Sequence, residues 1–188
     1  DSLSNLGNSL LEIENYKLAY ECFRQVVKLD PTDFDATFRL GITCNNLKMP
    51  AKALIYFNKL LSRDKNNVDV LINKGYSLHL MGKYGRAILC YKQVLKQDPD
   101  EINAIYYMSK STARQNDAKQ TCELISKLLK LQFINDLDHD HDHNHNHDHD
   151  HNHDHNHKQV HLIEKIQKDS DFKRMRTNAN FLFLLKHN

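Results

Sequence analysis

The 188-residue chain has no tryptophan, only five glycines and three prolines, and no apolar run longer than five residues, for example Phe181–Leu185. Scarce glycine and proline argue against a turn-rich β protein. Runs this short cannot span a bilayer, so we expect no membrane association. The four cysteines form no C-x-x-C pair, which indicates reduced packing residues in the cytoplasm or nucleus rather than a disulfide framework. They are Cys22, Cys44, Cys90 and Cys122.

The net charge of +2 is the sum of segments with different balances. Residues 1–137 contain 19 Lys or Arg and 15 Asp or Glu, and residues 158–188 contain 7 and 3. No basic stripe with interleaved aromatics is present, so nucleic-acid binding is not expected. No charged-then-apolar leader precedes Leu3, but the chain opens with Asp1 rather than Met, which leaves open whether a native N-terminal segment is missing.

Several residue types recur with a spacing of 34, which indicates a repeat. The repeating positions hold Gly7, Gly41 and Gly75; Ala19, Ala53 and Ala87; Phe23, Phe57 and Tyr91; and Pro31 and Pro99, two periods apart. Within each period an apolar helical stripe passes through the glycine, a short polar break follows, and a second stripe passes through the alanine and the aromatic residue. We expect each period to be a helical hairpin. Its glycine and alanine would let the two backbones approach, and its aromatic would fill the gap to the next hairpin.

These columns resemble the tetratricopeptide-repeat (TPR) family. The resemblance implies an all-α, right-handed superhelical solenoid of helix-turn-helix hairpins. The expected array spans residues 1–135, with repeats at about 1–33, 34–67, 68–101 and a degenerate fourth at 102–135. Repeat 2 departs from the family pattern by having Cys44 at a large apolar position and no proline. Repeat 4 departs by having Thr121 in place of the alanine.

The C-terminal region resembles the short helices that close some TPR arrays. Asp169, Asp171, Phe172, Arg176 and Phe181 fit a D-x-D-F, R and F-x-x-L pattern. We therefore expect capping helices over residues 158–188, since the exposed end of a repeat stack needs cover. Residues 136–157 are then a disordered His/Asp/Asn insertion between a helix ending near residue 131 and a cap helix starting near residue 159.

The resemblance also implies a function, because TPR domains use a concave groove lined by the first helix of each hairpin. We expect a non-enzymatic adaptor or scaffold that binds a peptide or amphipathic helix there. An exposed apolar strip of this kind usually marks a binding site, but the C-terminal segment or a missing N-terminal helix could instead fold over it. The expected groove residues are Asn8, Phe38, Ile42, Asn45, Ile72, Tyr76, His79, Tyr106 and Lys110, with Asp35 and Asp69 along one edge.

Some TPR domains hold a chaperone's C-terminal carboxylate with a clamp of two Lys, two Asn and one Arg. At the matching positions this chain has Asn8 but otherwise Ser4, Arg39, Asp69 and Asn73. Because Asp69 would repel a carboxylate, we expect no chaperone-type carboxylate clamp.

A tract at residues 138–157 contains ten His, six Asp and four Asn. Its histidines occupy alternate positions: His139, His141, His143, His145, His147, His149, His151, His153, His155 and His157. Three interpretations stay open: an inert spacer produced by low-complexity expansion, a Zn or Ni buffer or sensor, and a pH-dependent switch. The metal interpretation is the alternative function, although the ligands are interchangeable and adventitious binding is expected in any case.

No phosphate loop, nucleophile elbow or His-Glu-x-x-His motif occurs in the chain. We therefore expect no catalysis and no cofactor beyond adventitious Zn or Ni. The partner's identity does not follow from the sequence.

Overall fold

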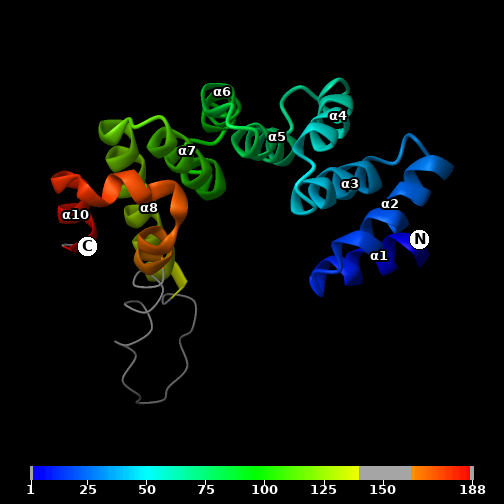
Figure 1. Ribbon diagram of the computed structural model, residues 1–188, viewed down its shortest axis with the longest axis horizontal. Coiled ribbons are helices and arrows are strands. Elements are labelled where there is room, and N and C mark those ends of the chain that lie inside the picture. The colour runs from blue at the N-terminus through cyan, green and yellow to red at the C-terminus, as the bar shows by residue number, and fades with distance from the viewer. Residues whose placement is uncertain (1, 140–161, 187–188) are drawn as a thin grey trace, which may run out of the picture. The chain divides into compact units, whose positions relative to one another are not determined.

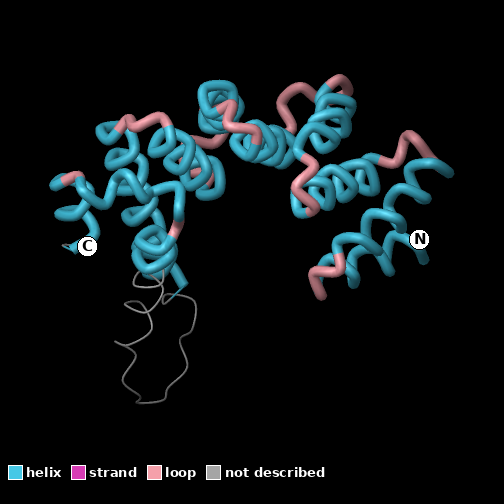
Figure 2. Tube along the Cα trace, in the orientation of Figure 1, coloured by secondary structure: helices cyan, strands magenta, loops and turns pink. Residues whose placement is uncertain are grey.

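The structure is a computed structural model that describes residues 2–139 and 162–186, with only the backbone for 132–139. Throughout the described ranges the regular structure is helical (Figure 1, Figure 2). Four hairpins follow one another: α1 (Ser2–Glu12) with α2 (Tyr16–Leu29), α3 (Phe34–Asn46) with α4 (Pro50–Leu61), α5 (Val68–Leu80) with α6 (Tyr84–Leu95), and α7 (Ile102–Arg114) with α8 (Ala118–His139). Residues 162–168 are helical, and η1 (Ser170–Thr177) and α10 (Ala179–Lys186) complete the described chain.

The predicted all-α array of consecutive hairpins is confirmed. The chain forms two compact units, residues 1–97 and residues 98–188. In the first unit each helix packs on the next along the chain, from α1 through α6, and in the second α7 packs on α8. This packing of each element on its chain neighbour is the pattern of a solenoid.

Each hairpin turns at the same repeat position, where the backbone is left-handed. The residues are Glu14, Lys48, Gly82 and Asn116, with φ values of 58°, 59°, 73° and 64°. The amide of the next residue bonds to a carbonyl five positions back, for example Met49 N to Cys44 O at 2.8 Å. This is the hydrogen bond of a helix that ends in a left-handed residue. The turn therefore depends on backbone geometry, which only Gly82 adopts without a steric cost.

The repeating glycines lie beneath the aromatic residue of their own hairpin. A Cβ built on Gly41 would lie 2.5 Å from Cε1 of Phe57, and one built on Gly75 would lie 2.5 Å from Cε1 of Tyr91. Both rings are fully buried. The ring occupies the space that the missing side chain leaves within its own hairpin. In the first repeat Phe23 also shares a buried cluster with Leu40 of the next hairpin, as expected.

The fourth hairpin keeps this packing with different residues. Ser109 stands at the glycine position and Ile125 at the aromatic position, and both are fully buried. The larger side chain on α7 is matched by a smaller one on α8. At the neighbouring positions Thr112 Oγ1 and Thr121 Oγ1 lie 2.9 Å apart in a buried pair. The degenerate repeat therefore retains its interior by compensating exchanges.

Side chains of the second helices bond to the loop that precedes their own hairpin. Lys59 Nζ donates to Pro31 O at 2.6 Å, Gln93 Nε2 donates to Lys65 O at 3.0 Å, and Lys127 Nζ donates to Pro99 O at 2.6 Å. These donors are spaced by 34 residues, as are the acceptors. Carbonyls at the ends of the repeats are thereby satisfied.

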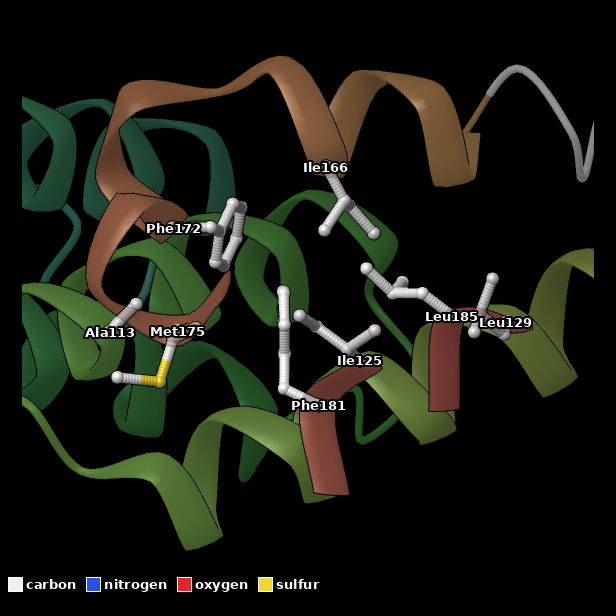
Figure 3. Packing of buried hydrophobic residues seen from close by; sticks show 8 residues of the cluster. All are labelled: Ala113, Ile125, Leu129, Ile166, Phe172, Met175, Phe181 and Leu185. Carbon is white, nitrogen blue, oxygen red and sulfur yellow. The ribbon is translucent and has the colours of Figure 1, made fainter. Parts of the chain in front are cut away.

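The C-terminal segment packs on α7 and α8 (Figure 3). Ile166, Phe172, Met175, Phe181 and Leu185 are buried against a set from the fourth hairpin that consists of Ala113, Ile125 and Leu129. The rings of Phe172 and Phe181 stack with centroids 6.0 Å apart. The segment covers an apolar surface that a further hairpin would cover in a longer array.

The boundaries around the histidine tract differ from the expected ones. The helix expected to end near residue 131 continues as α8 to His139, and the described chain resumes at residue 162. The expected insertion at 136–157 lies largely outside the described residues, as do His141 to His157.

Candidate interaction face on the first helices

The predicted groove residues all lie on first helices. Asn8 is on α1, three others are on α3, three are on α5, and Tyr106 and Lys110 are on α7. Helices α3 and α5 contact each other within the first unit, so their residues form a continuous surface. The α7 residues belong to the second unit and are described with it.

An aromatic and aliphatic surface is partly open on α3 and α5. Phe38, Ile42 and Tyr76 are half-buried. Phe38 packs edge-on against the buried Phe57, with ring centroids 6.1 Å apart. Its other neighbour is Phe34, whose ring is stacked at 6.4 Å and is 38% exposed. This surface is therefore anchored in the core but still accessible from outside.

Phe34 is a residue that the sequence analysis missed. It follows Asp33, whose side chain caps α3 by accepting from Ala36 N at 2.8 Å. The spacing of four between Phe34 and Phe38 was the available signal.

Asn8 lies on α1 at the position equivalent to Ile42. It is half-buried, and its Oδ1 finds no hydrogen-bond partner among the described residues. A buried acceptor without a donor costs free energy, so this oxygen is a local weakness of the packing on α1. We define the first-helix face as Asn8, Phe34, Phe38, Ile42 and Tyr76.

Three predicted groove residues are buried inside the stack instead. Ile72 and His79 are 7% and 8% exposed, and Asn45 is 2% exposed. Asn45 Oδ1 accepts from Ser77 Oγ at 2.9 Å, which joins α3 to α5, and the His79 ring meets the Tyr84 ring edge-on at 5.2 Å. The side chains of these three residues are buried within the stack of helices. The prediction that they line an open groove is therefore corrected.

In the second unit Tyr106 and Lys110 contact the C-terminal segment. Tyr106 Oη donates to Asp169 Oδ2 at 3.1 Å, and Lys110 Nζ pairs with Asp169 at 2.9 Å and with Asp171 at 3.1 Å. Lys165 Nζ lies 4.9 Å above the Tyr106 ring. The Lys110 and Asp side chains are each 15% exposed. The alternative in which the chain covers part of its own groove therefore holds on α7.

The electrostatics of this contact follow from burial and charge. Burial raises the pKa of Tyr106, so its hydroxyl stays protonated as a donor. For Lys110, burial opposes the charged form, but the hydrogen bond and charge of Asp169 outweigh it and raise its pKa. The ammonium therefore stays charged, and the ion pair persists at neutral pH.

The acidic edge is partly neutralised. Asp35 Oδ1 lies 3.5 Å from Arg39 Nε, on exposed side chains. Asn73 Nδ2 donates to the backbone of Asp69 at 2.9 Å. The positions that would hold the two lysines of a carboxylate clamp carry Ser4 and Asp69 in this chain. The absence of such a clamp stays a prediction.

Other kinds of site find little support in the described part of the chain. No group of three or more His, Cys, Asp or Glu residues there could hold a metal ion, and no helix there is long and apolar enough to cross a membrane. Burial raises the pKa of the Cys44 thiol to about 11 and also raises the pKa of Cys90 and Cys122. These thiols are protonated packing groups rather than nucleophiles.

A hollow of about 610 Å³ lies between α8 and α10 in the second unit. Phe183, Leu184, Lys127 and Lys130 are among the residues that line it. Lys127 already pairs with Asp100 at 2.9 Å. The hollow contains none of the residues predicted from the repeat pattern, and the first-helix face remains the candidate site.

Repeated helical hairpins with a partly open apolar face define the class of helical-repeat interaction scaffolds. The model of the tetratricopeptide repeat family matches residues 1–33 and 68–101, the first and third predicted repeats. The chain therefore contains tetratricopeptide repeats in these two segments.

Comparisons with known proteins agree with this assignment. The human small glutamine-rich tetratricopeptide repeat-containing protein beta is 26% identical over 124 residues, covering 60% of this chain and 38% of that protein. The chain thus matches less than half of the relative's length. Residues 41 to the end of MamA from Desulfovibrio magneticus RS-1 superpose with a TM-score of 0.66 and 22% identity, covering 71% of this chain and 76% of that one. The first TPR of Spaghetti (RPAP3), bound to the HSP90 peptide SRMEEVD, gives a TM-score of 0.55 and 20% identity over 59% and 88%. These two structures show the shared fold.

Proposed function

We propose that this protein is an adaptor that binds a peptide or amphipathic helix of a partner on the first-helix face of residues 1–97. The supporting observation is the partly open surface of Phe34, Phe38, Ile42 and Tyr76, which rests on the buried Phe57. Apolar residues presented at helical spacing suit the apolar side of a docked helix or an extended peptide. The solved TPR structure that holds a peptide supports binding of this kind.

The partner of this face has a definable chemistry. Its central residues are aromatic or aliphatic and are partly open. The bound segment should therefore present two or three large apolar side chains. Because Asp69 takes the place of a clamp lysine, we do not expect a free C-terminal carboxylate to be required.

Selection from a displayed library of random peptides of about five helical turns, against the full chain, tests this proposal. We expect enriched peptides that lose at least tenfold in affinity, or about 1.4 kcal/mol, when the chain carries Phe34→Ser and Ile42→Ser. The matched control carries Leu18→Ser and Leu29→Ser, which replace two exposed aliphatic residues on the second helix α2.

Thermal unfolding of both variants checks that the fold is kept. Equal binding by the Phe34/Ile42 variant and the wild type would contradict the proposal. So would enriched peptides whose binding depends only on the C-terminal carboxylate.

A further inference from the structure

Two exposed aliphatic residues occupy equivalent positions on consecutive second helices. Ile55 on α4 is 67% exposed and Leu89 on α6 is 66% exposed, and they are 34 residues apart. The same position holds Glu21 in the first repeat and Glu123 in the fourth. An acidic residue is therefore compatible with the helix at this position, and the fold does not require Ile or Leu there.

These residues point away from the interior of their hairpins. The inner side of α4 buries Ala53 and Phe57, and the inner side of α6 buries Ala87 and Tyr91. Both helices pack on α5, and Figure 1 shows them on either side of it. Ile55 and Leu89 thus occupy the same outward position on two second helices, distinct from the first-helix face.

Positive charge surrounds the two aliphatic residues. Lys52 and Arg86 lie three residues before Ile55 and Leu89, and Lys92 lies three residues after Leu89; all three are exposed. On a helix this spacing places the side chains on neighbouring positions. Among the described residues no ion pair is formed by Arg86 or Lys92, and the ammonium of Lys52 lies 5.8 Å above the Tyr20 ring.

The basic residues are concentrated in the part of the chain that contains Ile55 and Leu89. Residues 34–97 contain eleven Lys or Arg and three Asp or Glu, whereas residues 1–33 contain three and six. The second and third hairpins are therefore basic. A basic surface of this kind raises the association rate of an acidic partner and disfavours a basic one.

We propose that Lys52, Ile55, Arg86, Leu89 and Lys92, called here the outward face, bind an acidic amphipathic helix of a partner protein. Ile55 and Leu89 contact the apolar side of that helix, and its carboxylates lie beside the three cations. An anionic membrane is a weaker match, because the outward face lacks the aromatic residues that anchor proteins at bilayers. Nucleic acid is also weaker, because phosphate contacts do not use aliphatic side chains.

The test selects peptides from the same displayed library for binding to the full chain that carries Phe34→Ser and Ile42→Ser. These changes remove the contribution of the first-helix face to peptide binding. We expect enriched peptides with net negative charge and apolar residues at helical spacing. Their Kd should rise at least tenfold on adding Ile55→Glu and Leu89→Glu. It should also rise between about 0.1 M and about 1 M salt, as the Debye length shortens from ~10 to ~3 Å.

Leu29→Glu is the matched control, because Leu29 is 79% exposed on α2 and lies outside the outward face. It should leave peptide affinity unchanged, and thermal unfolding should show that all variants are folded. A second arm measures co-sedimentation of the same chain with phosphatidylserine/phosphatidylcholine vesicles.

Three outcomes would overturn the outward-face proposal. They are failure to enrich any acidic amphipathic peptide, enriched peptides insensitive to the Ile55/Leu89 change, and vesicle binding that this change abolishes while no peptide binds. None of them bears on the first-helix face, which is removed throughout this experiment.

Discussion

At the scale of single residues, the close contact between glycine and aromatic ring makes a sharp energetic prediction. Gly75→Ala should destabilise the protein by about 1–3 kcal/mol, because its Cβ would lie 2.5 Å from Cε1 of the fully buried Tyr91. In a Tyr91→Ile background the same change should cost little, since Ser109 already coexists with Ile125 in the fourth hairpin. Denaturant unfolding of the four chains of this double-mutant cycle measures the difference.

Gly85→Ala is the control for the effect of replacing a helical glycine by alanine at an exposed position. Gly85 is exposed on α6, so the change should raise stability slightly through helix propensity. Equal costs of Gly75→Ala in the wild-type and Tyr91→Ile backgrounds would show that the ring is not what excludes a side chain at this position.

At the scale of elements, the C-terminal segment is held to α7 by polar contacts as well as by its apolar core. Asp169→Asn should destabilise the second unit by about 1.5–3 kcal/mol, because it weakens a hydrogen-bonded ion pair with Lys110 that is only 15% exposed. Lys110→Met should cost at least as much, because it leaves the buried carboxylates of Asp169 and Asp171 without the Lys110 cation. Hydrogen exchange of the α10 amides measures the opening of this segment.

Lys168→Met provides the comparison for an exposed pair. Lys168 and Glu164 are 3.1 Å apart with side chains 78% and 50% exposed, so their loss should cost at most about 0.5 kcal/mol. If the two changes accelerated α10 exchange equally, the Asp169 contact would be no stronger than a surface ion pair.

The sequence predicted the elements well because each is determined locally. A spacing of 34 with apolar stripes, polar breaks and Asp-Pro stops is sufficient to define hairpins. It could not predict that Tyr106 meets Asp169, since these residues are 63 positions apart and no repeat pattern relates them. Nor could it separate Asn45 from Ile42, which occupy adjacent turns of α3. Their burial differs through a bond to Ser77 on α5, which depends on how the hairpins stack.

At the scale of the whole molecule, the repeats supply two surfaces of different character. The first-helix face is apolar and aromatic, whereas the outward face is basic with two aliphatic residues. Each uses side chains that the repeat interior does not require, such as Phe34 and Leu89. A scaffold of this kind could bring two partners together, and the variants above separate the contributions of the two faces.

The role of the histidine tract is the remaining question at this scale. A zinc titration distinguishes a spacer from a metal-binding segment. Calorimetry should compare the intact chain with a version lacking residues 138–157. We expect weak, graded uptake by the intact chain alone, because ten interchangeable imidazoles offer many similar sites and no defined second shell. Tight, saturable binding with a small whole-number stoichiometry would contradict the spacer interpretation. It would favour a metal-responsive function acting beside the repeats.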